Sequence, residues 1–98
     1  MSIYGNVLIS AGSEYKNTNT LYSYSAESYV RVSKCLDSEG TVREIHEIWY
    51  PGVPSSSTHA NAPDGSVCYD TTNGDVYIKL AATKPGTGIA GAWTKASP

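Results

Sequence analysis

Hydrophobic and polar residues alternate along two stretches of the chain, and each stretch predicts a β-hairpin. The first hairpin lies within residues 21–50, and its turn lies at 37–41, where Gly40 is suited to the left-handed conformation. With Asp37 opposite Thr41, a single register aligns three apolar pairs and two pairs of opposite charge. These pairs are Leu36 with Val42, Val30 with Ile48, Tyr29 with Trp49, Lys34 with Glu44, and Arg31 with Glu47. A helix explains the spacing of the apolar residues but not this pairing, so we expect two strands.

The second predicted hairpin is centred on Asn73-Gly74. Because this dipeptide accepts positive φ at both positions, we expect a two-residue type I′ turn with Thr72 opposite Asp75. In this register one side of the hairpin is apolar. The side chains expected on that side are Val67, Tyr69, Val76, Ile78 and Leu80. A short closing strand at 92–95 is expected to fold Trp93 over the same side.

The remaining segments connect and flank the two hairpins. Residues 3–10 are expected to form a strand and the polar residues 11–20 an extended arm, which packs either on its own sheet or on a neighbouring subunit. Prolines and a run of serines in residues 51–62 predict an exposed connector. We therefore expect an N-terminal strand and arm over 1–20 and a hairpin domain over 21–98, folded as a small antiparallel β-sandwich or β-barrel-like domain.

The composition supports an all-β fold and narrows the choice of partner. Among 98 residues there are eight Tyr, two Trp and no Phe, and these aromatic residues suit both strands and subunit interfaces. Charged residues make up 16% and the net charge is -2, so we expect no nucleic-acid partner. A chain of this length buries little surface, which makes self-association a reasonable source of further stability.

The titratable side chains do not suggest an enzyme, and we expect no cofactor and no metal. His46 is expected inside a strand opposite Val32, and His59 in a flexible loop where nothing would hold it near a nucleophile. Aspartates near the turns are expected to cap them. Cys35 and Cys68 are expected to be free thiols, although the sequence leaves a bridge between them open. No apolar run reaches membrane-spanning length, so we expect no membrane insertion.

One long segment resembles a known family. It reads Pro63-Asp64-Gly65-Ser66-Val67-x-Tyr69-Asp70-Thr71-Thr72-Asn73-Gly74-x-Val76-Tyr77-Ile78-Lys79 and is followed by Gly91-Ala92-Trp93-Thr94. This pattern resembles a segment that recurs in virion proteins of tailed bacteriophages, namely tail fibres, tail spikes and small capsid-decorating or head-fibre proteins. The resemblance implies a homotrimeric structural protein of the virion, assembled in the host cytoplasm and in contact with proteins such as the major capsid protein.

Two functions follow as expectations from this resemblance and from the aromatic residues. The first is a capsid decoration, cement or head-fibre protein, whose core and threefold interface would use Tyr29, Val30, Ile48, Trp49, Val67, Tyr69, Val76, Ile78, Leu80 and Trp93. The alternative is a tail-fibre or tail-spike module that binds a receptor or a host surface glycan. In that case sugar rings would stack on Trp49, Tyr50 and Trp93.

Overall fold

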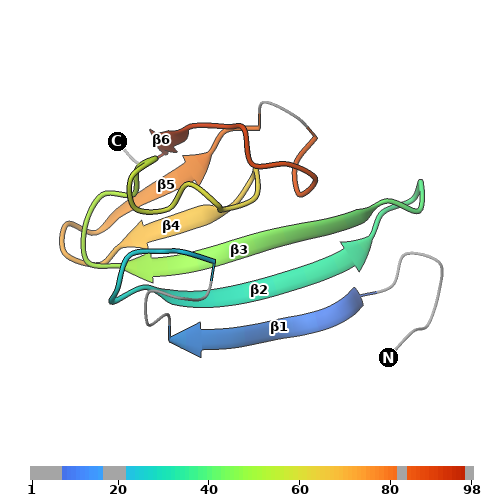
Figure 1. The fold of residues 1–98 in the computed structure, drawn as a ribbon, viewed down its shortest axis with the longest axis horizontal. Coiled ribbons are helices and arrows are strands. Elements are labelled where there is room, and N and C mark those ends of the chain that lie inside the picture. Colours follow the sequence, from blue (N-terminus) through green and yellow to red (C-terminus); the bar gives the residue numbers. More distant parts are fainter. Residues whose placement is uncertain (1–7, 17–21, 82–83, 97–98) are drawn as a thin grey trace.

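The computed structural model of the chain describes residues 8–16, 22–81 and 84–96, whose strands form one six-stranded sheet (Figure 1). The strands lie across the sheet in sequence order: β1 (Leu8–Lys16), β2 (Tyr29–Leu36), β3 (Val42–Tyr50), β4 (Val67–Asp70), β5 (Asp75–Lys79) and β6 (Trp93–Lys95). Neighbouring strands are antiparallel except β3 and β4, which are parallel. The all-β prediction is confirmed, but the sheet is mixed rather than wholly antiparallel.

The β2–β3 hairpin has the predicted register throughout. The Asp37 amide donates to the carbonyl of Thr41 over 3.0 Å, and Gly40 has φ +81°. Both expected ion pairs form, with 3.7 Å between Arg31 and Glu47 and 3.5 Å between Lys34 and Glu44. The turn and the cross-strand pairs therefore specify the same alignment.

The β4–β5 hairpin differs from the prediction by two residues, because Asp70 rather than Thr72 lies opposite Asp75. A four-residue loop replaces the expected type I′ turn. The Asp70 carboxylate accepts hydrogen bonds from the amides of Thr72 and Asn73, and the Gly74 amide donates to the Asp70 carbonyl. Only Gly74 needs positive φ in this loop, at +76°. The side chain of Asp70 thus selects the longer loop, and the even shift leaves the grouping of side chains by face unchanged.

The segment between β3 and β4 was expected to be an exposed connector, and this was wrong. It joins two parallel strands, so the chain must cross back over one face of the sheet. Pro54 and Ala62 are buried there, and His59 is fully buried. The serines that suggested a linker form a tight turn instead, in which the amides of Thr58 and His59 donate to the Ser55 carbonyl.

Strand β1 corrects the expectation that residues 11–20 are an arm. Residues 11–16 belong to β1, which pairs with β2 of the same chain through two irregularities in register. Such irregularities are common at the edges of sheets. The rest of the predicted N-terminal strand and arm, at 3–7 and 17–20, lies outside the described residues.

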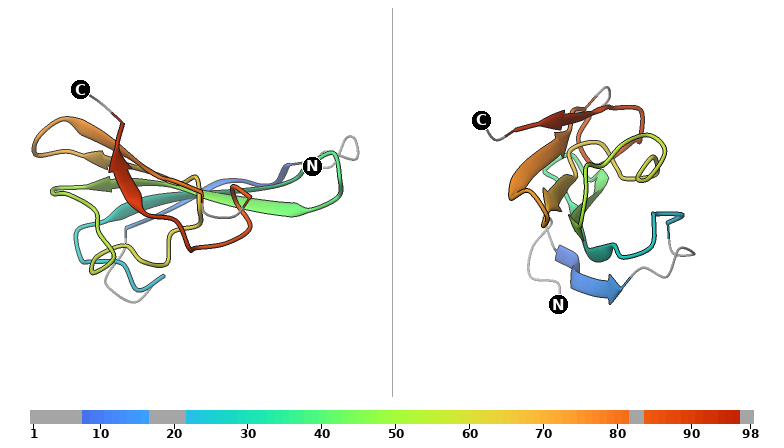
Figure 2. Two further views of the ribbon diagram at one scale, coloured as in Figure 1. Left: turned by 90° about the horizontal axis from the view of Figure 1, so that it is seen from above. Right: turned by 90° about the vertical axis from the view of Figure 1, so that its left-hand side faces the viewer.

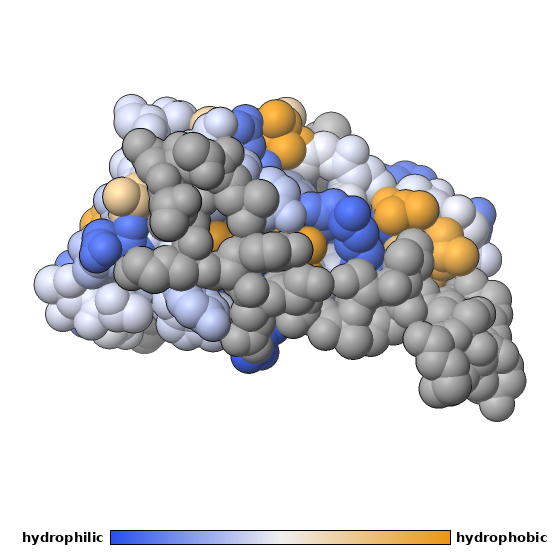
Figure 3. Space-filling model, turned by 60° about the horizontal axis from the view of Figure 1, so that its bottom comes forward, coloured by the Kyte–Doolittle hydropathy of each residue, from blue (hydrophilic) through white to orange (hydrophobic). Residues whose placement is uncertain are grey.

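The sheet has two unlike faces. The described loops at 22–28, 51–66 and 84–92, which we call the loop layer, lie on one side of the sheet (Figure 2). We call the sheet surface beneath them the inner face and the opposite surface the outer face. Within one chain, the loop layer occupies the position that a second sheet would have in the expected sandwich. Seen from the β1 edge, hydrophobic residues form small patches between hydrophilic ones (Figure 3).

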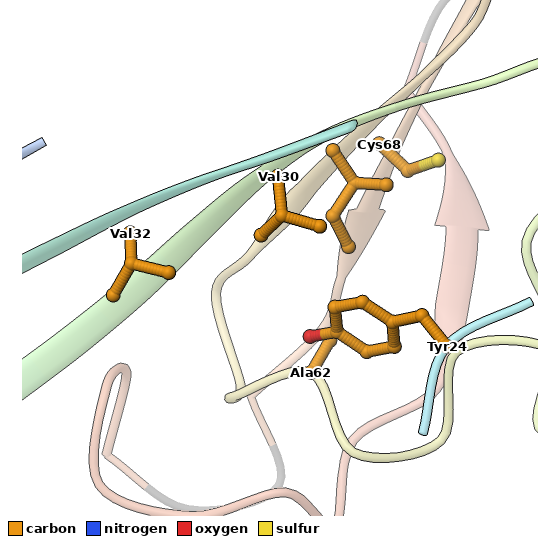
Figure 4. Packing of buried hydrophobic residues seen from close by; sticks show 6 residues of the cluster. Tyr24, Val30, Val32, Ala62 and Cys68 are labelled. Carbon is orange, nitrogen blue, oxygen red and sulfur yellow. The ribbon is translucent and has the colours of Figure 1, made fainter. Parts of the chain in front are cut away.

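The core lies between the inner face and the loop layer. Val30, Val32 and Cys68 extend from the strands, while Tyr24 and Ala62 come from the loops that cover them (Figure 4). Together with Ile48, these side chains are the buried hydrophobic residues of the described chain. Cys35 and Cys68 lie on strands that are not neighbours, and both thiols are free.

Side-chain alternation divides the expected interface residues between the two faces. Val30 and Ile48 lie on the inner face and are fully buried, whereas Tyr29 and Trp49 lie on the outer face. In β4 and β5 the expected apolar side is also the outer face, with Val67, Tyr69, Val76 and Ile78, and the following Leu80 is exposed. Trp93 packs against the core on the inner face, so the expectation that it covers the apolar side was wrong. The inner positions of this hairpin are Cys68, Asp70, Asp75, Tyr77 and Lys79.

Candidate functional site

The outer face carries a row of aromatic rings across three strands. Tyr29 on β2 meets Trp49 on β3 edge to face, with ring centroids 6.4 Å apart. Trp49 stacks on Tyr69 of β4 at 5.2 Å and an interplanar angle of 26°. The rings meet because the β2–β3 and β3–β4 registers place these three residues side by side. The result is a row of three contacting aromatic rings across β2, β3 and β4.

A charged pair flanks this row. The Arg31 guanidinium lies 5.5 Å from the centre of the Trp49 ring and 3.7 Å from the Glu47 carboxylate. The Tyr69 hydroxyl donates to the other oxygen of Glu47 over 3.4 Å. Partial burial and the nearby Glu47 carboxylate raise the pKa of Tyr69, so its hydroxyl stays protonated. Arg31 and Glu47 offset each other's charge.

Aliphatic residues continue the surface onto β4 and β5. Val67 lies opposite Ile78, and Val76 lies opposite Tyr69. Ile78 is 36% exposed and Tyr29 is 43% exposed, although both belong to strands of the sheet. The loop layer lies on the other side, so no described loop covers this surface (Figure 2). The outer face therefore presents apolar and aromatic groups of the kind that form the centre of protein interfaces.

The inner face is held to the loop layer by a buried lysine. The Lys79 ammonium donates to the carbonyls of Ala60, Ala62 and Ile89 over 2.7, 2.6 and 2.8 Å, and the residue is 2% exposed. Burial lowers the pKa of Lys79, and the nearby Asp64 carboxylate opposes this change. Three acceptors match the three N–H donors of an ammonium, so Lys79 joins two segments of the loop layer and has no donor left for a ligand.

Asp64 anchors loop 84–92, one of the two segments of the loop layer that Lys79 joins. Its carboxylate accepts a hydrogen bond from the Gly91 amide over 2.5 Å, and its own amide donates to the Gly88 carbonyl. Gly65 follows with φ +92°, and a Cβ there would lie 3.1 Å from Pro85. The motif that begins at Pro63 thus has a structural explanation: it shapes the turn before β4 and anchors loop 84–92 beside it.

His46 takes part in a buried polar chain. The Tyr24 hydroxyl donates to its Nδ1 over 2.6 Å, and its Nε2 donates to the Glu44 carboxylate over 2.6 Å. Burial lowers the pKa of His46 despite the Glu44 carboxylate, and burial raises the pKa of Tyr24. A neutral imidazole satisfies both hydrogen bonds. The prediction that His46 lies in a strand opposite Val32 is confirmed, and the residue is buried.

His59 was expected in a flexible loop, and this was wrong. Its Nε2 donates to the Ser28 hydroxyl over 2.8 Å, and its Nδ1 accepts from the Thr58 hydroxyl over 2.8 Å. Its ring packs edge to face against Tyr50 at 4.6 Å. Burial lowers the pKa of His59 to about 4, so the ring is neutral near pH 7. His59 connects two segments of the loop layer.

The contact between Ser28 and His59 has the spacing of a nucleophile and its base, but its surroundings do not suit catalysis. The Ser28 hydroxyl donates to the Ser25 carbonyl over 2.7 Å, and both residues of the pair are fully buried. A hydroxyl that already donates to a carbonyl and has no access to solvent cannot attack a substrate. The pair is a link between loops.

A groove of about 510 Å³ opens beside the loop layer. Segments 54–60 and 89–92 contribute its walls, and Lys79 and Trp93 complete its lining. The Trp93 indole is fixed, because its Nε1 donates to the His59 carbonyl over 3.2 Å. Mostly apolar walls with a few hydroxyl groups are suited to a small uncharged ligand.

The three aromatic residues expected to stack on sugars do not form one surface. Tyr50 and Trp93 pack against the core on the inner side, and Trp49 lies on the outer face. Any stacking on Trp93 is therefore separate from stacking on Trp49.

Other kinds of site have little support in the part of the chain that the structure describes. The described residues contain no group of three or more His, Cys, Asp or Glu side chains placed to hold a metal ion. Within the same part of the chain, no helix is long and apolar enough to cross a membrane. Burial raises the pKa of the Cys68 thiol to about 12, which makes it a poor nucleophile.

Comparison of the chain with protein-family models, with curated proteins and with solved structures finds no match. The geometry of the outer face and of the groove is therefore the basis for a function. The residues that sequence reasoning missed are Lys79, Asp64 and His59. For Lys79 a signal existed, because a lysine in a strand of apolar residues alternates onto the same side as Cys68.

Proposed function

We propose that this chain is a structural protein of a tailed-bacteriophage virion, which assembles as a homotrimer and acts through protein–protein contacts as a capsid decoration, cement or head-fibre protein. The observation that carries the proposal is the outer face, an aromatic and aliphatic sheet surface at the centre of a small domain. Surfaces of this kind on small domains usually mark a contact with another protein.

The segment that resembles phage virion proteins supports a structural role. Its residues Asp64, Asp70, Asn73 and Lys79 all have partners within the chain, where they close a turn or anchor a loop. A motif whose polar residues hold a fold together is expected in proteins whose function is to provide shape and contact area. What the motif leaves for partners is the outer side of β4 and β5.

The proposed trimer and sandwich would both use the outer face. Each chain has a sheet with one face covered by its own loop layer, so a second sheet layer would have to come from a neighbouring subunit. Three outer faces around a threefold axis would bury Tyr29, Trp49 and Tyr69 together. In this arrangement the expected threefold interface consists of the outer face alone.

A capsid assay tests the proposed function. Purified capsids of the encoding phage that lack this protein are mixed with it, pelleted and heated in parallel with untreated capsids. We expect the protein to pellet with the capsids and to raise the temperature at which they release DNA. A protein that stays in the supernatant at every concentration would contradict the proposal.

The groove at Trp93 favours a second candidate, a glycan-binding module of a tail fibre or tail spike. A fixed indole in a mostly apolar groove, with Ser55 and Ser56 on its wall, has the features of a saccharide subsite. Titration calorimetry with neutral saccharides that bind on a glycan array would test it. Trp93→Ala should abolish binding while Trp49→Ala, on the other face, leaves it unchanged, and the reverse pattern would exclude the groove.

A further inference from the structure

We infer that the outer faces of three copies of this chain meet around a threefold axis, so that Arg31 of each subunit lies against Glu47 of the next. The inference rests on the proposed role in assembly and names the partner of that surface. Three properties of the outer face support it: the residue types at its centre, its balance of charge and its shape.

The centre of the outer face has the composition of an interface hot spot. Trp49 is contacted by Tyr29, Tyr69 and Arg31, and Trp, Tyr and Arg are the residue types that contribute most binding energy in protein interfaces. Ring-to-ring contacts already fix these side chains. Little side-chain entropy would therefore be lost when a partner covers them.

The charges on the outer face favour a copy of itself over a charged partner. Arg31 and Glu47 stand side by side at the edge of the aromatic row, and their side chains are 42% and 35% exposed. Two contacts of the Glu47 carboxylate are long, at 3.7 Å to Arg31 and 3.4 Å to Tyr69. Because both signs of charge stand side by side, Arg31 of one copy can meet Glu47 of the next around a threefold axis. A strongly anionic or cationic partner would meet one like charge.

The shape of the surface also fits the sheets of neighbouring subunits. Val67, Val76 and Ile78 extend the aromatic row onto two further strands, so the apolar area covers the width of β2 to β5. Apolar sheet faces bury their side chains by interleaving them with those of other sheets, and three such faces around an axis can enclose one core. A sugar or a single peptide strand would cover the aromatic row but leave the aliphatic part in water.

A charge-exchange experiment tests the inference on the full chain. Two variants are made, Arg31→Glu and Glu47→Arg, and self-association is measured by sedimentation over a dilution series for each variant and for their equimolar mixture. Each variant alone places like charges across the contact, and we expect its association to weaken by about tenfold or more. In the mixture the acidic surface of one variant can meet the basic surface of the other. Association should therefore recover, because most contacts in a mixed trimer then join opposite charges.

The mixture distinguishes an effect on the contact between subunits from an effect on the structure of a single subunit. In both variants the pair inside the chain is mismatched, and mixing does not repair it. Recovery in the mixture therefore requires the two positions to meet across the interface. A mixture that associates no better than its components, or variants that associate like the unmodified chain, would overturn the inference.

The capsid assay on the same proteins distinguishes the inference from the proposed function. Capsid binding by a chain that fails the charge-exchange test would leave the function in place and remove the inference. Recovery in the mixture without any capsid binding would support the inference and contradict the proposed function. Thermal unfolding of each variant, followed by circular dichroism, verifies that the compared chains are folded.

Discussion

Lys79 on β5 donates to the carbonyl of Ala62 in the loop layer over 2.6 Å, a contact between a buried cation and a neutral acceptor. Lys79 also donates to the carbonyls of Ala60 and Ile89, so its side chain connects the crossover after β3 with the loop before β6. The fold thus places a charged side chain in its interior and apolar side chains on its outer face.

Replacing this lysine should destabilise the fold strongly. Lys79→Met keeps the length of the side chain but leaves the buried carbonyl of Ala62 and the partly buried carbonyls of Ala60 and Ile89 without this donor, and we expect a loss of about 3 kcal/mol in the free energy of unfolding. Urea denaturation measures it. Lys84→Met is the matched control, because Lys84 is 71% exposed and meets Glu39 at 3.7 Å on the surface. A change below about 0.5 kcal/mol is expected there, and equal effects of the two variants would contradict the role of Lys79.

Stability should fall on acidification through His59. The pKa of His59 is lowered from 6.5 to about 4 in the folded chain, so between these values the unfolded chain binds a proton that the folded chain does not. The contribution of His59 is complete above pH 6.5 and decreases as pH falls toward 4, by about 2–3 kcal/mol. His59→Gln preserves a donor toward Ser28 and removes the titration. Urea denaturation at pH 7.5 and pH 4.5 should show a smaller difference for this variant than for the unmodified chain, and an unchanged difference would refute the assignment.

Two glycines should differ in their tolerance of alanine. A Cβ at Gly91 would overlap the Leu80 carbonyl oxygen and lie 2.7 Å from the Asp64 carboxylate, so the loop would have to open. We expect Gly91→Ala to cost about 3 kcal/mol. At Gly74 a Cβ meets nothing within 4 Å and only the φ of +76° is unfavourable, so Gly74→Ala should cost about 1 kcal/mol. Thermal unfolding compares the two, and a milder effect at Gly91 would be inconsistent with this loop packing.

The two thiols should react at different rates. Cys35 is partly exposed, whereas Cys68 is fully buried and its pKa is raised to about 12. A colorimetric thiol reagent at pH 8 should therefore modify one thiol in the native protein and the second only in denaturant. Rapid modification of both in the native protein would show that Cys68 is not in the core.

The sequence predicted the β2–β3 hairpin fully because two independent signals coincide there. The Asp37 to Gly40 turn fixes the loop length, and the charge pairs of Arg31 with Glu47 and Lys34 with Glu44 fix the register. Each signal is local, so no information from distant segments was needed.

The β4–β5 hairpin was harder because its polar side chains decide its structure. Asp70 accepts three hydrogen bonds from the loop and lengthens it, and Lys79 gains three carbonyl partners that belong to segments distant in sequence. An apolar pattern alone assigns such residues to solvent. The hairpin has its polar side on the inner face and its apolar side on the outer face because of these contacts, which no local pattern contains. The burial of His59 also depends on contacts with distant segments.

The candidate interface was predicted in part. Tyr29, Trp49 and Tyr69 were named from composition and pairing, and they meet on the outer face as one row. Val30 and Ile48 were named in the same set of core and interface residues, and alternation along β2 and β3 places these two in the core. The parallel pairing of β3 with β4, which brings Tyr69 beside Trp49, depends on the crossover and was not predicted.

The most direct test of the account is the mass of the native particle by light scattering on a sizing column, over a dilution series. Ile78→Asp places a charge on the outer face, and Val53→Asp is the matched control, since Val53 is 53% exposed in the crossover. We predict a particle three times the mass of one chain for the unmodified protein and for Val53→Asp, and a folded or partly unfolded monomer for Ile78→Asp. A monomer at every concentration of the unmodified protein, or a trimer that Ile78→Asp leaves intact, would contradict the claim that the outer face is a subunit contact.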